Sequence, residues 1–464
     1  MKTVDRTEHT AEPLPAQRSG HRRDLAAAGA GAALVVAAAL VGRAIESTDH
    51  TLYVHWPPLL ASWYPHIGPG TWAAPVVAAA VIVHGPVLAE TLRWRTLLLS
   101  CYATALAWIL SLALIDGWGR GIAERLTTKH EYLRVIGRFD DIGAALRGFN
   151  DHILIGPPGN WPAHVAGHPP GATLTFVLLD RIGLGGGAWA GVWCIVTGAG
   201  AVLAALITVR ALAGEYFARR AAPFLVLAPV AVWAGTSADG YFTAVAAWSV
   251  ALLALAATRK VRRPAAAALG AGLLYGLACY LSYGLTLIAL PLLAVLVLTR
   301  TARPLTPFVL GALVVPVAFT LAGFDWWEAY HLLVERYYQG AGGFRPYSYW
   351  VWANLACTAI AVGPATLAGL RRTAAGVPGA VRTLRTGTAT SPQRLIVLVS
   401  AALLALLAAD LSGMSKAETE RIWQPFILWL LPAAALLPAP GRRGWLAAQA
   451  VVALAVNHLL WTGW

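Results

Sequence analysis

The sequence predicts an all-α protein that crosses a membrane many times, and two observations lead to this fold class. Of the 464 residues, 58% are hydrophobic and only 12% are charged, whereas soluble domains carry about 25% charged residues. Long apolar runs also recur along the whole chain, each bounded by charge or by Pro, Gly or Trp. Because a bilayer core needs about 17–25 apolar residues per helix, runs of this length indicate transmembrane helices.

The apolar runs predict about 13 transmembrane helices within a single polytopic membrane domain, residues 25–464. The expected spans are residues 25–44, 72–92, 96–115, 188–211, 221–236, 241–257, 265–282, 283–299, 305–322, 350–370, 395–411, 422–437 and 445–460. The polar residues 1–24 are expected to form a disordered cytoplasmic tail. Residues 371–394, rich in Thr, Gly and Arg, are expected to form a cytoplasmic linker.

The arginines set the expected orientation. The formal net charge is +13, and with a cytoplasmic N-terminus the arginine-rich loops near residues 93–95, 259–263 and 442–443 are cytoplasmic, as the positive-inside rule requires. On this topology 16 of the 22 acidic residues lie outside. The working face is therefore expected to be extracytoplasmic, and a nucleic-acid partner is not expected.

Three outer loops are long enough to carry function: residues 45–71, 116–187 and 323–349. In the middle loop, residues 168–184 begin with His-Pro-Pro and contain too short an apolar run for a full crossing. A full crossing would also move every later arginine cluster to the outside. We therefore expect a short juxtamembrane or re-entrant helix there.

The same loop contains an amphipathic pattern over residues 131–149, with a break expected near Phe139. Apolar residues recur at helical spacing opposite charged ones, namely Leu133, Ile136, Ile142, Leu146 and Phe149 against Arg134, Arg138, Asp141 and Arg147. Such a helix lies on the membrane interface. It would hold Glu131, Asp140 and Asp141 at lipid head-group level, where a carboxylate can deprotonate a hydroxyl or bind a divalent metal. The alternative is that each is a solvated loop charge.

The middle half of the chain, residues 96–300, resembles a known membrane-enzyme core. The features that carry the resemblance are His168-Pro169-Pro170 opening a short helix, Gly185, the turn at residues 210–214 followed by Arg219-Arg220, a Pro-containing span and Asp239. They are similar to the protein-mannosyltransferase-like and aminoarabinose-transferase-like enzymes of the glycosyltransferase C superfamily. The resemblance implies transfer of a sugar, with inversion, from a polyprenyl-phosphate donor to a cell-wall glycan, lipid or protein acceptor. The reaction would take place at the outer face of a bacterial plasma membrane.

The resemblance also assigns the catalytic base to an outer-loop acid. Glu131, 37 residues before His168, holds the position of that acid. His130 precedes it where the family commonly has an Asp, and some arabinose-transferring relatives use an Asp-Asp pair. The base is therefore expected to be Glu131 or the Asp140–Asp141 pair, while the resemblance places His168 and Asp239 at the substrate.

Basic residues on the outer side run against the charge trend and are candidates for binding the donor phosphate. They are Arg345, Lys416 and Arg421. The alternatives are an interfacial anchor for Arg345 and mutual neutralisation of Glu420 and Arg421. A divalent metal is a candidate cofactor, with His164, His168 and Asp239 as candidate ligands. Asp239 could instead cap the helix that follows it.

The alternative function is that of a transporter or flippase of a polyprenyl-linked or lipid substrate. Coupled transporters bury charges in mid-span at broken helices. Here most acidic residues gather at the outer edge of the expected spans. This distribution favours an enzyme.

Overall fold

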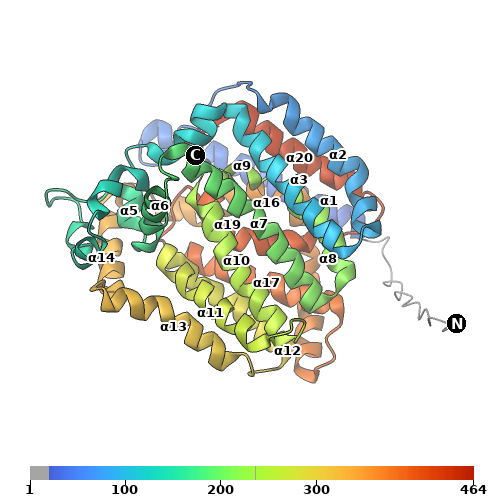
Figure 1. The fold of residues 1–464 in the computed structure, drawn as a ribbon. Coiled ribbons are helices and arrows are strands. Elements are labelled where there is room, and N and C mark those ends of the chain that lie inside the picture. Colours follow the sequence, from blue (N-terminus) through green and yellow to red (C-terminus); the bar gives the residue numbers. More distant parts are fainter. Residues whose placement is uncertain (1–19, 236, 464) are drawn as a thin grey trace.

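The computed structural model describes residues 20–235 and 237–463, and within these ranges the chain is almost entirely helical (Figure 1). The long helices pack around a buried apolar core, with α5, α6 and α14 grouped at one end of the view. The all-α fold class is confirmed. Within the described residues, eight helices are long and apolar enough to cross a membrane.

The eight long helices include most of the apolar runs seen in the sequence. They are α1 (His21–Thr48), α2 (Gly70–Thr91), α3 (Trp94–Ala113), α7 (Gly187–Ala213), α10 (Ala238–Ala257), α11 (Pro264–Leu281), α16 (Tyr347–Thr386) and α17 (Ser391–Leu411). The α16 helix is kinked at Gly363, which has a φ of +74°.

Shorter elements complete the bundle and its outer loops. Within the bundle they are α8 (Glu215–Val226), α9 (Ala231–Ala234), η7 (Tyr283–Ile288), α12 (Ala289–Thr299), α13 (Leu305–Leu321), α19 (Gln424–Leu430), η8 (Leu431–Leu436) and α20 (Arg442–Leu459). In the loops they are η2 (Leu114–Asp116), η3 (Gly119–Ala123), η4 (Arg125–Thr127), η5 (Tyr132–Phe139), α4 (Ile142–Arg147), η6 (Asn150–His152), α5 (Ala163–Gly167), α6 (Gly171–Arg181), α14 (Trp326–Gln339), α15 (Ala341–Phe344) and α18 (Thr419–Ile422). The strands β1 (Ala61–Trp63) and β2 (Leu460–Thr462) pair antiparallel, with Ser62 opposite Trp461.

The expected count of 13 spans is not confirmed. The α13 helix adds a ninth span only if it is taken together with α14, from which it is bent by 79°. The expected spans at residues 283–299 and 422–437 are short apolar helices. Residues 221–236 do not form one helix, because α8 ends at Val226 and a turn containing Pro229 separates it from α9. Proline lacks the backbone N–H that a continuous helix needs.

Two expectations about cytoplasmic segments need correction. Residues 371–394 are not a linker, because α16 continues to Thr386 and α17 begins at Ser391. Of the expected tail, residues 1–19 lie outside the described residues, while His21 to Asp24 already belong to α1. Asp24 is fully buried and forms ion pairs with Arg371 at 2.8 Å and Arg372 at 2.6 Å. This contact joins the start of α1 to α16, which are far apart in the sequence.

The α10 helix is at the centre of the bundle and connects its two ends. Most of α10 is buried, and it packs on α7 and α11. The α11 and α13 helices run parallel and approach closely at glycines, since a side chain on Gly272 would overlap the backbone of α13 and one on Gly311 would overlap the backbone of α11. Asp239 lies in the first turn of α10, and the loop after α10 begins at Thr258. Ends that are 20 residues apart on a helix are about 30 Å apart.

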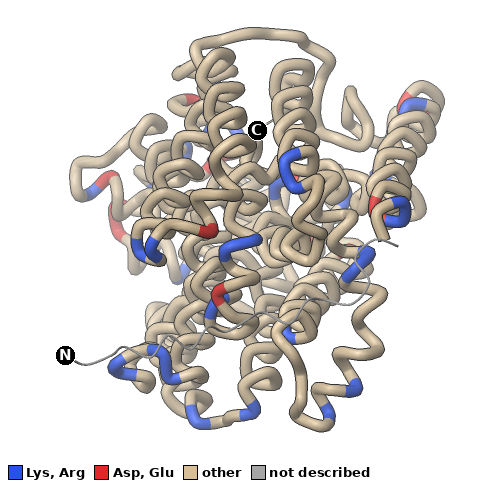
Figure 2. The backbone as a smooth tube through the Cα atoms, turned by 90° about the vertical axis from the view of Figure 1, so that its right-hand side faces the viewer, with Lys and Arg blue, Asp and Glu red and all other residues tan. Residues whose placement is uncertain are grey.

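Charge is sorted between the two ends of the bundle. Figure 2 shows that the loops at its lower end carry Lys and Arg, while Asp and Glu lie higher in the bundle. This separation agrees with the charge pattern that predicted the orientation. The orientation itself remains a prediction.

Candidate active site

The outer loop between α3 and α7 is held in place by buried ion pairs before it reaches Glu131. Asp116 accepts from Arg125 at 2.8 Å and pairs with His66 at 2.7 Å. Arg120 and Arg125 also donate to the carbonyl oxygen of Thr462, at 2.7 and 3.3 Å. These contacts anchor the short helices η3 and η4. The segment before Glu131 is therefore held by the His66 side chain and by the backbone of Thr462, which are far apart in the sequence.

The amphipathic segment is divided at the expected place. Residues 132–139 form the 3₁₀ helix η5 and residues 142–147 form α4, so the break near Phe139 is confirmed. Tyr132, Val135 and Phe139 of η5 are buried, and Arg134 and Arg138 are exposed. Glu131 is the residue at the N-terminal boundary of η5. The apolar face of η5 thus fixes the backbone next to this carboxyl group.

Glu131 is buried, with only 3% of its surface exposed. Its Oε1 lies 2.9 Å from Nδ1 of His164. Its Oε2 is buried and accepts no hydrogen bond from any residue that the structure describes. The backbone N–H of His164 donates to the carbonyl oxygen of His130 at 3.0 Å, which holds the two segments together. One carboxylate oxygen is therefore positioned by histidine while the other can accept a proton.

The surroundings of Glu131 favour its charged form. Burial alone raises the pKa of this carboxyl, but His164 and Arg421 outweigh burial, and the pKa lies below its ordinary value. Nearby positive charge and hydrogen bonds to a carboxylate both stabilise the anion. Glu131 is therefore a carboxylate at neutral pH, the form that a general base requires.

His168 follows the chain into α6 and is neutral. Its Nδ1 lies 2.9 Å from the carbonyl oxygen of Leu281, and burial lowers its pKa to about 3. Since Nδ1 donates to that carbonyl, Nε2 is left as an acceptor. The ring packs edge-on against Tyr132, with 5.9 Å between ring centroids, and at 5.5 Å from the ring of Phe242. The short helix expected after His-Pro-Pro is present as α6.

Asp239 and Arg421 form a buried ion pair. Nη1 of Arg421 donates to Oδ2 of Asp239 at 2.6 Å, and Nη2 donates to Glu418 at 3.2 Å. Ser237 is at the N-cap position of α10, so Asp239 is not the capping residue. Arg421 pairs with Asp239 and Glu418, which argues against simple neutralisation by Glu420. Arg421 also lies close enough to Glu131 for its charge to lower the pKa of that carboxyl.

The other two candidate phosphate-binding residues, Arg345 and Lys416, lie near Glu418, which also pairs with Arg421. Arg345 donates to the carbonyl oxygens of Leu52 at 2.9 Å and Lys416 at 2.7 Å, and it lies 3.7 Å from Glu418. Lys416 donates to the carbonyl oxygen of Gly342 at 2.7 Å. Ala417 and Glu418 have φ values of +76° and +64°, which are unfavourable for residues with a side chain. Such conformations are concentrated at functional sites.

Asp140 and Asp141 are placed differently from Glu131. Both are exposed. Asp141 is the N-cap of α4 and accepts from the N–H of Ala144 at 2.9 Å, while the backbone oxygen of Asp140 accepts from Arg181. The structure thus brings together Glu131, His164, His168, Asp239 and Arg421. Asp140 and Asp141 lie apart from this group and make contacts that hold the loop in place. Glu418, which links Arg345 to Arg421, did not stand out in the sequence because one acid among several in a loop carries no signal.

The candidate metal ligands do not form a metal site. Among residues 20–235 and 237–463, no group of three or more His, Cys, Asp or Glu side chains is arranged to hold an ion. The three candidates already have partners: His164 pairs with Glu131, His168 with Leu281 and Asp239 with Arg421. Arg421 is the positively charged group that pairs with Asp239 and lowers the pKa of Glu131.

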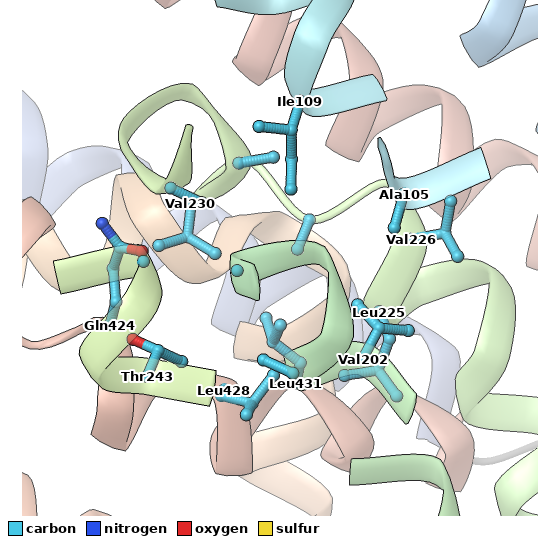
Figure 3. Close-up of a pocket in the computed structure, with 16 residues that line it drawn as sticks. Ala105, Ile109, Val202, Leu225, Val226, Val230, Thr243, Gln424, Leu428 and Leu431 are labelled. Carbon is cyan, nitrogen blue, oxygen red and sulfur yellow. The ribbon is translucent and has the colours of Figure 1, made fainter. Parts of the chain in front are cut away.

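A small apolar cavity of about 50 Å³ borders this polar cluster (Figure 3). Gly240, next to Asp239, and Gln424, three residues after Arg421, both line it. Apolar side chains supply most of the remaining wall, among them Ile109, Val202 and Leu225 in Figure 3. A second apolar cavity of about 220 Å³ between α2, α3 and α8 also has Val226 in its wall. Leu92 and Leu97, at the turn between α2 and α3, also line this second cavity.

Comparison with known proteins finds solved structures with a similar fold. No protein-family model matches the chain, and no curated protein matches its sequence. The crystal structure of the Archaeoglobus fulgidus oligosaccharyltransferase in the apo form is similar, with a TM-score of 0.50 and 13% identity, over 79% of this chain and 56% of that chain. At this identity the similarity shows a shared fold. The resemblance seen in the sequence is thus confirmed for the fold.

Two further structures show weaker similarity. The oligosaccharyltransferase AglB from Archaeoglobus fulgidus, in complex with an inhibitory peptide and a dolichol-phosphate, has a TM-score of 0.43 at 13% identity and covers 74% of this chain and 50% of that one. ArnT from Cupriavidus metallidurans, bound to undecaprenyl phosphate, has a TM-score of 0.35 at 16% identity and covers 65% of this chain and 59% of that one. The chain therefore spans just over half the length of the proteins it matches.

Proposed function

We propose that this protein is a membrane glycosyltransferase. It takes a sugar from a polyprenyl-phosphate donor and passes it to a hydroxyl-bearing acceptor of the cell envelope on the extracytoplasmic face. The observation that carries the proposal is Glu131, a buried carboxylate whose Oε2 has no hydrogen-bond partner in the described structure, beside the Asp239–Arg421 pair. A carboxylate oxygen that accepts no other hydrogen bond is suited to remove a proton from a hydroxyl group.

The proposed reaction is one in-line displacement. Oε2 of Glu131 accepts the proton of the acceptor hydroxyl while the acceptor oxygen bonds to the anomeric carbon. The bond between that carbon and the phosphate oxygen breaks on the opposite side, so the anomeric configuration inverts. The electron pair of that bond stays on the leaving polyprenyl phosphate. General-base assistance of this kind contributes about 10²–10⁴ in rate.

The cations of the site fit the donor phosphate. Arg421, Arg345 and Lys416 gather around residues 415–421 and the start of α16, and fixed positive charge stabilises a leaving phosphate. The apolar cavity beside Gly240 supports an apolar group of the donor next to this charge. A polar head joined to an apolar chain describes a polyprenyl phosphate.

The test is incubation of the purified protein with a panel of polyprenyl-phosphate sugars and measurement of released polyprenyl phosphate. Release with one donor, stimulated by an acceptor, is expected. Glu131→Gln keeps the size of the side chain but removes the base, and it should lower turnover at least about 10²-fold. Asp140→Asn and Asp141→Asn are matched controls from the same loop and should change turnover little.

Two results would contradict the proposal. If no donor in the panel is cleaved while labelled lipid moves between leaflets, the protein is a transporter or flippase. If Glu131→Gln retains full turnover and an Asp140 or Asp141 variant does not, the enzyme assignment stands but the base is wrong.

A further inference from the structure

A basic hollow of about 660 Å³ lies at the end of α10 opposite the candidate active site. Arg259, Arg262 and Arg303 line it. The rest of its wall is mainly small or apolar: Ala256, Ala257, Val261, Pro264, Ala265, Thr301, Pro304 and Pro307. It therefore combines positive charge with an apolar wall, and nothing in the proposed reaction uses it.

Two loops form this basic hollow. One connects α10 to α11 over residues 258–263, and the other connects α12 to α13 over residues 300–304. Pro264 is at the first position of α11, and Pro304 precedes α13, which restricts both loops. Arg259 has a φ of +55°, a conformation that favours glycine. This conformation ends α10, where the N–H of Lys260 donates to the carbonyl oxygen of Leu255 at 3.0 Å.

The positive charge of the hollow is not balanced by nearby protein groups. None of its lining residues is acidic, and none of the ion pairs among the described residues includes Arg259, Arg262 or Arg303. The first turns of α11 and α13 also contain no acidic residue. Their N-termini add partial positive charge of the same sign. An anion is the group that would complete this surface.

The surface next to the hollow is apolar and faces outward. The only buried residue of α13 is Gly311, and Leu305, Val309 and Leu310 near the start of this helix are 43%, 43% and 58% exposed. An apolar face of this kind on a membrane helix contacts lipid chains. A ligand with an anionic head in the hollow can therefore place its chains along α13.

We propose that the basic hollow binds the head group of an anionic phospholipid from the leaflet at this end of the bundle. The phosphate lies among Arg259, Arg262 and Arg303, and the acyl chains follow the outward face of α13. The apolar face of α13 favours a lipid over free inorganic phosphate. This inference does not depend on the proposed glycosyl transfer, because the two sites are at opposite ends of α10.

Native mass spectrometry of the purified full-length protein tests the proposal. The protein is titrated with phosphatidylglycerol and, separately, with phosphatidylcholine. The wild type should retain one phosphatidylglycerol, while the triple variant Arg259→Gln/Arg262→Gln/Arg303→Gln should bind it about 10²-fold more weakly. The matched control Arg23→Gln/Arg382→Gln/Arg385→Gln removes three exposed arginines elsewhere and should bind like the wild type. Melting curves without added lipid show whether each variant is folded.

Every alternative outcome overturns the proposal in a defined way. Equal loss in both triple variants would mean that only overall charge matters. Equal retention of phosphatidylcholine would mean that the head-group charge is not recognised. Displacement of the lipid by the same concentration of inorganic phosphate would identify free phosphate as the ligand. If the triple variant is unfolded, the single variant Arg303→Gln replaces it, and unchanged binding there would count against the site.

Discussion

The carboxyl groups of Glu131 and Asp141 belong to one loop but lie in different surroundings. Glu131 is buried against His164, whereas Asp141 is exposed and caps α4. The distinction depends on which residues lie nearby in space, because both acids fit the amphipathic pattern equally well. The sequence could therefore predict an acid in this loop but could not choose between them. The same holds for Arg421, whose partner Asp239 is far away in the chain.

Replacing His164 should change the pH dependence of the reaction. His164 is a main cause of the low pKa of Glu131, so in His164→Gln that pKa should rise. Because the base acts as the carboxylate, the acid limb of log(kcat/KM) against pH should move to higher pH, with activity recovering on the alkaline side. A lower activity with an unchanged profile would show that His164 has only a structural role. His152→Gln, from the same loop, is a control.

Replacing Asp239 should destabilise the protein more than replacing an exposed acid. Asp239→Asn removes the carboxylate that accepts from Nη1 of the buried Arg421 at 2.6 Å, and breaking a buried pair on one side costs about 3–5 kcal/mol. The thermal midpoint should fall, whereas Asp140→Asn should leave it nearly unchanged.

The double variant Asp239→Asn/Arg421→Gln distinguishes coupling from independent damage. It should be less destabilised than the sum of the two single variants, because residues that interact directly are not additive. Additive effects would argue against a direct contribution of this pair to stability.

At the scale of elements, helix boundaries depend on contacts as well as on composition. The apolar runs predicted the bodies of the long helices well, and His-Pro-Pro correctly predicted a short helix. The helical residues beyond Arg371 could not be predicted, and the contact of Arg371 and Arg372 with Asp24 of α1 joins segments far apart in the sequence. The break at Pro229 was also missed, because a 16-residue apolar stretch with proline fits either a kinked span or two short helices.

Gly272 should be far more sensitive to substitution than Gly270 on the same helix. A methyl group at Gly272 would overlap the carbonyl oxygen of Phe308 in α13, whereas at Gly270 it would meet only the end of the Leu252 side chain, at 3.4 Å. Alanine favours a helix over glycine by about 1 kcal/mol. Gly270→Ala should therefore be neutral or stabilising, and Gly272→Ala should lower the thermal midpoint. Equal midpoints would contradict the close packing of α11 and α13.

At the scale of the whole molecule, the sorted charges make the orientation testable. Cysteines are introduced singly at Arg263, in the loop before α11, and at Glu335, on α14, both exposed. The background lacks Cys101, Cys194, Cys279 and Cys357. An impermeant thiol reagent added to intact cells should label Glu335→Cys and should label Arg263→Cys only after lysis. Labelling of both from the same side would contradict the topology, since the two positions are expected on opposite faces.

The pairing of β1 with β2 has a consequence for the order of events during synthesis. Residues 61–63 enter the membrane system early, but their partners at 460–462 leave the ribosome only after all the long helices have been made. Thr462 also receives the hydrogen bonds of Arg120 and Arg125, which anchor the loop that carries Glu131. A nascent chain that has inserted these long helices but has not reached residue 462 therefore lacks the hydrogen bonds that anchor the Glu131 loop. The outer loop that carries Glu131 can therefore take its final position only after residue 462 has been synthesised.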